Sequence, residues 1–228
     1  MRIQLSVALT RLLRHPVTMR VKEVIRDLRW RLKGDVAQNP PLPQRIESLL
    51  FVCLGNICRS PFAGMLAQQR LTEIQVLGTV ARSAGIKTTQ SGRSPLEACE
   101  AATAYGISLE SHRPVLLTEN LMAAHDLVVV MEFQQMEHLR SVYPALASRV
   151  VLLPRFDTEA TGYERYNIED PFMRPPLAYA ACYSRIDRAV TALCAAISER
   201  ALAADSRELP ADRRLGDQDL RSPKATQQ

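Results

Sequence analysis

The chain has no apolar run long enough to cross a membrane. Hydrophobic residues make up 46% of its 228 residues, yet no stretch approaches the roughly 18 consecutive apolar residues of a membrane span. A small-residue cleavage site of the kind that ends a secretory signal is also missing. These absences predict a cytoplasmic protein.

Cysteine is sparse and shows no paired spacing. The five cysteines are residues 53, 58, 99, 182 and 194, without the C-x2-C pairs typical of zinc sites. Their odd number does not fit the disulfide framework of a small secreted domain. We therefore expect a protein of a reducing compartment without a metal site.

Acidic residues are rare in one segment only, the N-terminal extension at 1–33. It contains nine Lys and Arg against two acids, whereas residues 34–228 contain twenty against twenty-two. A leucine-rich stretch before Pro16 predicts a short first helix. The helix after it has an apolar stripe, formed by Val17, Val21, Val24, Ile25, Leu28 and Leu32. Such a basic amphipathic helix either packs on the following domain or binds an anionic membrane surface or a partner protein. An organelle transit peptide is disfavoured because serine is scarce, and no nucleic acid is expected as a partner.

Hydrophobic periodicity predicts one α/β domain at 46–200. A basic helical extension with a proline-rich linker precedes it at 1–45, and a polar, disordered tail follows at 201–228. Strands are expected at 47–53, 75–82, 126–131 and 149–153, a short strand or turn at 107–110, and helices at 61–74, 94–106, 118–123, 132–140 and 177–200. The strands at 128–130 and 150–153 are apolar throughout, as in a parallel sheet that is buried on both faces. The pattern predicts a doubly wound, mainly parallel four-stranded sheet with helices on both faces and a ligand crevice at the carboxyl ends of the strands.

A distinctive loop follows the first predicted strand. Residues 53–61 read Cys-Leu-Gly-Asn-Ile-Cys-Arg-Ser-Pro. A strand that leads through a glycine-containing turn into a helix directs backbone N–H groups and the positive helix end at one small volume. Cys53, largely thiolate in such surroundings, is the candidate nucleophile, and Arg59 can chelate two oxygens of a phosphate group. The loop predicts a phosphate-ester site.

The remaining loop residues have supporting roles. Ser60 can donate its hydroxyl to the thiolate and ease the later departure of sulfur. Gly55 and Asn56 are expected to adopt positive φ so that the loop amides converge. Cys58 is either a small buried residue or a thiol that traps oxidised Cys53 as a disulfide. The expected substrate-binding residues are Leu54, Gly55, Asn56, Ile57, Cys58, Ser60 and Phe172.

The loop resembles, over its whole length, the phosphate loop of the low-molecular-weight protein tyrosine phosphatases. That family carries its general acid in a later Asp-Pro pair, and Asp170-Pro171 stands where it is expected. The resemblance implies that Asp170 protonates the leaving phenolate oxygen and that Ser83 braces Asn56. It also implies hydrolysis of phosphotyrosine through a phosphocysteine intermediate, without a metal or organic cofactor.

Alternative functions share this loop. Thiol-coupled arsenate reductases resemble the family but need further cysteines in a relay, and Cys99 has no close partner downstream in sequence. Protein arginine phosphatases typically carry threonine at the position of Ile57, whereas Ile57 and Phe172 would offer two apolar walls to a phenyl ring. A membrane- or partner-anchoring protein is the non-enzymatic alternative, and the complete Cys, Arg and Asp set argues against it.

Bacterial relatives that the chain resembles act in exopolysaccharide or capsule export. A phosphotyrosine protein, such as a bacterial tyrosine autokinase, is the partner that this resemblance implies. The expected location is the cytoplasm, at the inner membrane face if residues 1–33 bind lipid.

Overall fold

The structure is a computed structural model that describes residues 24–30, 32, 37–88 and 92–208. The predicted helix before Pro16, the Val17 and Val21 part of the apolar stripe, and residues 209–228 of the predicted tail lie outside the described residues.

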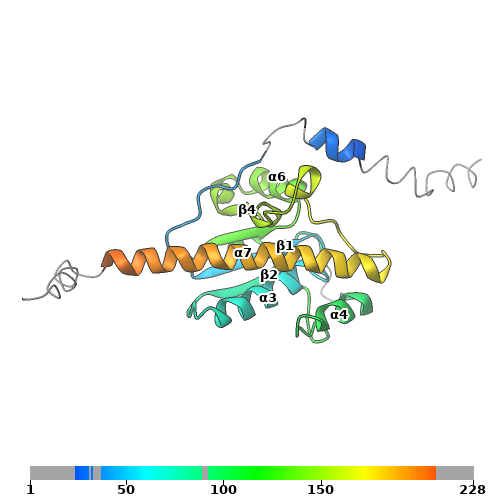
Figure 1. The fold of residues 1–228 in the computed structure, drawn as a ribbon, viewed down its shortest axis with the longest axis horizontal. Helices are drawn as coiled ribbons and strands as arrows, with labels where there is room; N and C mark the ends of the chain where they lie inside the picture. Colours follow the sequence, from blue (N-terminus) through cyan, green and yellow to red (C-terminus); the bar gives the residue numbers. More distant parts are fainter. Residues whose placement is uncertain (1–23, 31, 33–36, 89–91, 209–228) are drawn as a thin grey trace, which may run out of the picture.

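A parallel sheet of four strands forms the centre of the molecule (Figure 1). The strands are β1 (Ser48–Cys53), β2 (Val80–Gly85), β3 (Leu127–Val130) and β4 (Val150–Leu152), in the spatial order β2-β1-β3-β4. β1 pairs with β2 on one side and with β3 on the other. The strand order therefore reverses at β1, and ligands of doubly wound sheets bind beyond the carboxyl ends of the strands at such a point. Cys53 is the last residue of β1.

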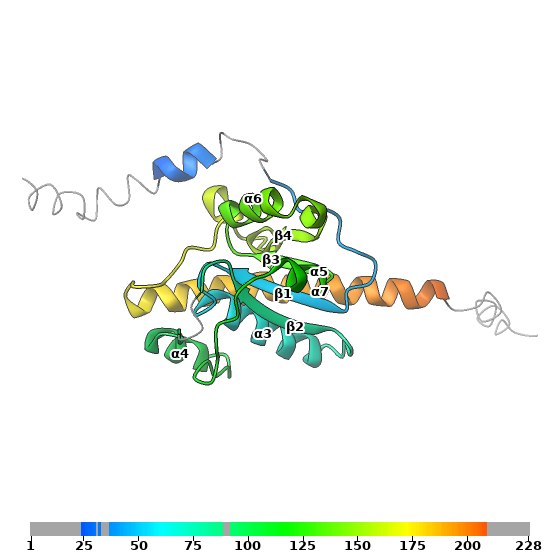
Figure 2. The same cartoon turned by 180° about the vertical axis from the view of Figure 1, so that it is seen from behind.

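Helices cover both faces of the sheet, which confirms the predicted fold class (Figure 2). On one face α3 (Arg59–Glu73) packs against the long α7 (Pro176–Glu208), and α4 (Leu96–Thr103) packs against α7. On the other face lie α5 (Glu119–Ala123) and α6 (Phe133–Val142). Within the described residues, no helix combines the length and apolar character that membrane crossing requires.

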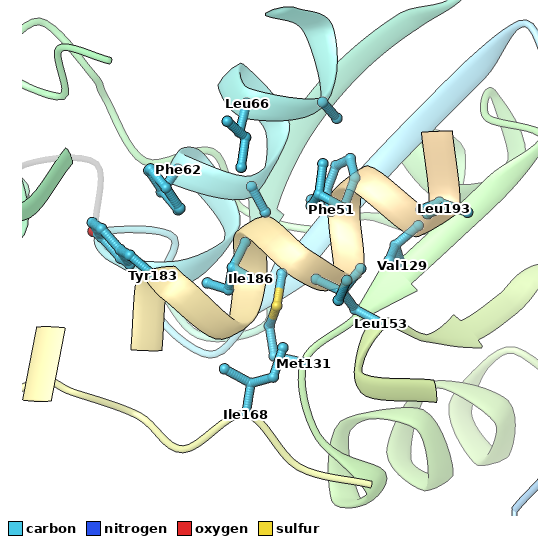
Figure 3. Packing of buried hydrophobic residues seen from close by; sticks show 14 of the residues in the cluster. Phe51, Phe62, Leu66, Val129, Met131, Leu153, Ile168, Tyr183, Ile186 and Leu193 are labelled. Carbon is cyan, nitrogen blue, oxygen red and sulfur yellow. The ribbon is translucent and has the colours of Figure 1, made fainter. Parts of the chain in front are cut away.

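Two hydrophobic cores lie on opposite faces of β1. Leu49 and Phe51 belong to the core below α3 and α7, and Leu50 and Val52 to the core below α5 and α6. Successive side chains of a strand point to opposite faces, so a strand in the middle of the sheet must be apolar at every position. Figure 3 shows the first core, in which Ile186 and Leu193 of α7 pack with side chains that include Phe51 and Val129 of the sheet.

Several element boundaries differ from the prediction. β2 begins at Val80 because the chain first makes a turn in which Gln75 and Gly78 have positive φ. Of the two alternatives for 107–110, the strand does not form, and the segment enters a turn at Glu110. α7 continues past the predicted end at 200 to Glu208, so the first part of the predicted disordered tail is helical. Three short 3-10 helices were not predicted: η1 (Pro144–Arg149), η2 (Leu153–Phe156) and η3 (Gly162–Arg165).

The proline-rich segment after the extension is fixed to an edge of the sheet. The Asn39 side chain donates to the Leu152 carbonyl at 3.0 Å and accepts from the Leu152 amide at 2.7 Å. These two bonds occupy backbone groups that an edge strand otherwise leaves unpaired. The segment is therefore more than a spacer.

Residues 24–30 form a helix that lies beside α6 and η3 (Figure 1). Its contacts with the domain come from Arg26, Asp27 and Trp30. The predicted apolar stripe is exposed to solvent. Its described members, which are 47–79% exposed, are Val24, Ile25, Leu28 and Leu32. This helix does pack on the domain, but with the face opposite to the one that hydrophobicity alone favoured.

Candidate active site

The loop between β1 and α3 wraps around the Cys53 sulfur. The backbone N–H of Asn56 donates to Sγ at 3.2 Å, and the Ser60 hydroxyl lies 3.1 Å from Sγ. Asn56 has the predicted positive φ, 53°. The same expectation for Gly55 is wrong, because Gly55 is not among the residues with positive φ, and a Cβ there would only touch Ile57 at 3.5 Å.

Asn56 holds the loop from the inside. Its side chain is fully buried and donates to Ser60 Oγ at 2.8 Å and to Ser83 Oγ at 2.9 Å, while its Oδ1 accepts from the Val115 amide at 2.9 Å. The structure thus places Ser83 against Asn56, as the resemblance implied. It also makes the Asn56 side chain a brace behind the cradle, so that only its backbone N–H faces the sulfur.

His112 binds the same residue from outside. Its Nε2 lies 2.8 Å from the Asn56 carbonyl, which can only accept, so Nε2 carries the proton. Burial lowers the pKa of His112, opposed by this hydrogen bond and assisted by the charge of Arg113. His112 is therefore a neutral donor that fixes the loop backbone.

Gly85, the last residue of β2, allows the loop to approach the sheet. A Cβ at this position would lie 2.9 Å from both the backbone nitrogen and the Cβ of Asn56. Contacts this short do not occur, so a larger residue would push the loop outward. The glycine keeps Asn56 within reach of Ser83.

Arg59 is the first residue of α3 and is only 1% exposed. Its Nη1 donates to the Glu132 carboxylate and, at 2.9 Å, to the Ile168 carbonyl, and its Nη2 donates to Asp170. Burial by itself lowers the pKa of Arg59, but the negative charges of Cys53, Asp170 and Glu132 raise it above the ordinary value. The guanidinium is a permanent cation held beside the nucleophile.

The segment that carries Asp170 is tied to the end of β3. Ile168 donates its N–H to the Met131 carbonyl at 2.9 Å, and Asn167 forms a bridge with Glu132. Asp170 itself accepts from the Phe172 amide at 3.2 Å and remains 39% exposed. The structure therefore brings together Cys53, Arg59 and Asp170, with Asp170 at the open side.

The three apolar candidates keep part of their surface accessible. Leu54 and Phe172 are about half exposed, and Ile57 is partly buried and packs against the first core. Among the described residues, no group of three or more His, Cys, Asp and Glu side chains is arranged to hold a metal ion.

Two residues of the site were not found from the sequence. Glu132 is the second residue after β3, and a carboxylate at the carboxyl end of a central strand was the signal that could have pointed to it. Tyr183 on α7 donates its hydroxyl to the Cys58 carbonyl at 3.1 Å, while its ring stacks on Phe62 at 3.9 Å (Figure 3). Tyr183 links α7 to the loop, and nothing in the sequence indicated that contact.

The other cysteines are poor nucleophiles. Burial raises the pKa of Cys58, and it raises the pKa of Cys182 and of Cys194 to about 12. Burial also raises the pKa of Cys99. Thiol exchange requires a thiolate, so these side chains do not favour the relay of an arsenate reductase or a fast disulfide between Cys58 and Cys53.

Known proteins share both the sequence and the fold. The family model for low molecular weight phosphotyrosine protein phosphatases matches residues 48–203. A relative from Ralstonia nicotianae, named as the probable low molecular weight protein-tyrosine-phosphatase EpsP, is 33% identical over 64% of this chain and 93% of its own.

Solved structures agree with this assignment. Wzb of Vibrio vulnificus, in complex with benzylphosphonate, is 29% identical with a TM-score of 0.57 over 65% of this chain and 97% of its own. The YwlE arginine phosphatase of Geobacillus stearothermophilus is 25% identical with a TM-score of 0.59 over 69% of this chain and 96% of its own. The chain belongs to the low molecular weight phosphotyrosine protein phosphatase family.

Proposed function

We propose that this protein hydrolyses phosphotyrosine in proteins, with Cys53 as the nucleophile, Arg59 as the phosphate ligand and Asp170 as the proton donor. The observation that carries the proposal is the buried Arg59 guanidinium, which contacts Asp170 directly and lies within the field of the Cys53 sulfur. The Arg59 guanidinium therefore interacts with both the proposed nucleophile, Cys53, and the proposed acid, Asp170.

In the first step the Cys53 sulfur attacks phosphorus. An S–P bond forms, the P–O bond to the phenol breaks, and Asp170 gives its proton to the leaving oxygen. The oxygens of the transferring group lie toward the loop amides and Arg59, which stabilise them as charge redistributes. The product is phosphocysteine and a free tyrosine side chain.

In the second step Asp170, now ionised, takes a proton from the water that attacks phosphorus. The S–P bond breaks, and inorganic phosphate and the Cys53 thiolate result. Ser60 has one hydroxyl proton and two acceptors within reach, Cys53 Sγ at 3.1 Å and the Ala84 carbonyl at 3.2 Å. Donation to sulfur as charge returns to it lowers the barrier for its departure.

The substrate preference rests on Ile57 and Phe172. Both are apolar and at least partly accessible, and a phenyl ring gains more from such walls than a guanidinium does. A protein arginine phosphatase is the second candidate, because the solved YwlE structure shares this fold. The preference for tyrosine is therefore the part of the proposal that needs its own test.

We would measure kcat/KM for phosphotyrosine, phosphoarginine and phosphoserine peptides of one sequence. Phosphotyrosine should be hydrolysed fastest, and Ile57→Thr should shift the ratio toward phosphoarginine. Cys53→Ser and Arg59→Ala should abolish turnover, while Cys194→Ser, a buried cysteine outside the loop, serves as the matched control. A wild-type preference for phosphoarginine would refute the tyrosine assignment and leave the cysteine mechanism standing.

We also propose that the extension places the enzyme at the inner membrane face. The exposed stripe of Val24, Ile25, Leu28 and Leu32 and the excess of positive charge in residues 1–33 support binding to anionic lipid. The enzyme should bind vesicles of phosphatidylglycerol and phosphatidylcholine, and less so at high salt. Ile25→Ser with Leu28→Ser should weaken this binding, whereas unchanged binding would exclude the stripe.

At that surface we propose a tyrosine autokinase of polysaccharide export as the substrate protein. The family resemblance supports this assignment. Cys53→Ser should retain the phosphorylated kinase in a pull-down from the native organism, and Cys53→Ser with Arg59→Ala should not. Retention of the kinase by both variants would show binding that does not depend on the phosphate site.

A further inference from the structure

The helix at 24–30 contacts the segment 162–170, which ends at the proposed acid and is called the acid loop below. Arg26 forms an ion pair with Glu169, and its guanidinium carbon lies 3.9 Å from the ring centroid of Tyr163. Asp27 Oδ1 accepts from the Tyr163 amide at 3.0 Å. One helix therefore binds the acid loop at its beginning and next to Asp170.

The aromatic contacts of Trp30 add to this attachment. Its ring stacks on Tyr166 with centroids 5.0 Å apart and meets Tyr163 and Phe133 edge-on at 5.9 Å and 5.5 Å. Aromatic pairs of this kind contribute about 0.5–1.5 kcal/mol each beyond the area that they bury. Trp30 anchors the helix to both the acid loop and α6.

Gly162 shows that the acid loop is shaped to receive this helix. The residue has φ of +51°, and a Cβ at its position would lie 1.7 Å from Asp27 Oδ1. Any side chain at 162 would therefore displace Asp27. The missing Cβ and the left-handed backbone make room for one carboxylate of the extension.

The acid loop borders a cavity close to Asp170. A cavity of about 580 Å³ lies between the helix, the acid loop and the first turns of α7, and Glu169, Asp170 and Cys182 are among its lining residues. The backbone bonds of Asn167 and Ile168 end before Asp170, and beyond them Glu169 is held by Arg26 and, at 3.1 Å, by Arg174. The ion pair with Arg26 thus bears on the residue just before the acid.

We propose that Arg26 is a positioning residue for Asp170, and that the helix at 24–30 is a working part of the active site. Arg26 holds Glu169, Asp27 holds Tyr163, and together they keep Asp170 over the mouth of the cradle and in contact with Arg59. The inference rests on the proposed role of Asp170 as the general acid. It goes beyond that role because it assigns a catalytic effect to a segment outside the residues that match the family.

The test uses the full-length protein and two substrates that differ in leaving group, a phosphotyrosine peptide and p-nitrophenyl phosphate. The value of kcat/KM reports the step in which the phosphoryl group moves to Cys53. The general acid contributes least to this step for p-nitrophenyl phosphate, because its leaving phenolate is already stable. Because small misplacements of a catalytic group are costly, Arg26→Ala should lower kcat/KM about tenfold for the peptide and less than about twofold for p-nitrophenyl phosphate. Arg26→Lys should restore most of the loss.

Arg29→Ala is the matched control, since it removes the same charge from an exposed position of the same helix, and its kcat/KM should equal that of the wild type. In an Asp170→Asn background, Arg26→Ala should cause no further loss, because a positioning residue has no effect once the acid is gone. Equal losses on both substrates, an equal loss in Arg29→Ala, or a full additional loss in the Asp170→Asn background would each overturn the proposal.

Asp170→Asn alone separates the two levels of inference. If it loses more activity on the peptide than on p-nitrophenyl phosphate while Arg26→Ala does not, only the role of Arg26 is wrong. If Asp170→Asn affects both substrates equally, the acid assignment and the positioning role fail together.

Discussion

Replacement of Asn56 by alanine should strongly destabilise the folded protein. The substitution removes hydrogen bonds to Ser60 and Ser83, worth about 1 kcal/mol each, and leaves the Val115 amide without its acceptor, which costs about 1–3 kcal/mol. Alanine at φ 53° adds about 1 kcal/mol of backbone strain. The free energy of unfolding should therefore fall by about 4–6 kcal/mol.

Urea denaturation followed by circular dichroism measures this change, and the melting temperature should fall by about 10–20 °C for a domain of this size. Asn56→Gly is the informative partner, because it loses the same hydrogen bonds without the strain and should be about 1 kcal/mol more stable than Asn56→Ala. Ser83→Ala, which removes one of the three bonds, should cost about 1 kcal/mol. An Asn56→Ala protein within 1 kcal/mol of the wild type would refute the role of Asn56 as the brace of the loop.

Three further changes test other parts of the site. Gly85→Ala should push Asn56 away from Ser83 and lower kcat/KM at least about tenfold by steady-state assay. Gly78→Ala strains a backbone with φ of 93° but meets nothing within 4 Å, so it should lower stability and leave kcat/KM unchanged. Glu132→Gln keeps the shape of the side chain but removes the charge that holds Arg59, so KM should rise and kcat/KM should fall about tenfold. An unchanged KM would show that Asp170 and Ile168 suffice to hold Arg59. The pKa of His112 is lowered in the folded protein, so its contribution to stability is present above the ordinary pKa of about 6.5 and is lost as the pH falls through the lower folded value. When unfolding is measured between pH 7 and pH 5, His112→Gln should therefore lose less stability than the wild type. Parallel pH curves for the two proteins would exclude His112 as the cause of the pH dependence.

The fold and the central chemistry could be predicted because they depend on local sequence. The apolar residues of β1, the loop that follows and the start of α3 are contiguous, so Cys53 and Arg59 could be placed together from their spacing. Asp170 required the family resemblance, since an Asp-Pro pair alone indicates only a turn.

The missed features depend on contacts between distant segments. Glu132 binds Arg59 across 73 positions of the chain, and Tyr183 reaches Cys58 across 125. The packed face of the helix at 24–30 could not be predicted for a related reason. Its hydrophobic stripe favoured Val24 and Leu28 as the packed face, but Trp30, Arg26 and Asp27 meet an aromatic and charged surface that hydrophobic periodicity does not register.

The most direct test of the central claim is to trap the covalent intermediate. Wild-type enzyme and Asp170→Asn would be mixed with a phosphotyrosine peptide, quenched in acid within the first turnovers, digested and examined by mass spectrometry. The proposed mechanism predicts one phosphate on the digestion fragment that contains Cys53 in the wild type and none in Cys53→Ala. With p-nitrophenyl phosphate, whose leaving group needs the acid least, Asp170→Asn should hold more phosphocysteine than the wild type because the water of the second step is not activated. Hydrolysis of the peptide by Cys53→Ala, or phosphate on a different residue of the wild type, would contradict the mechanism.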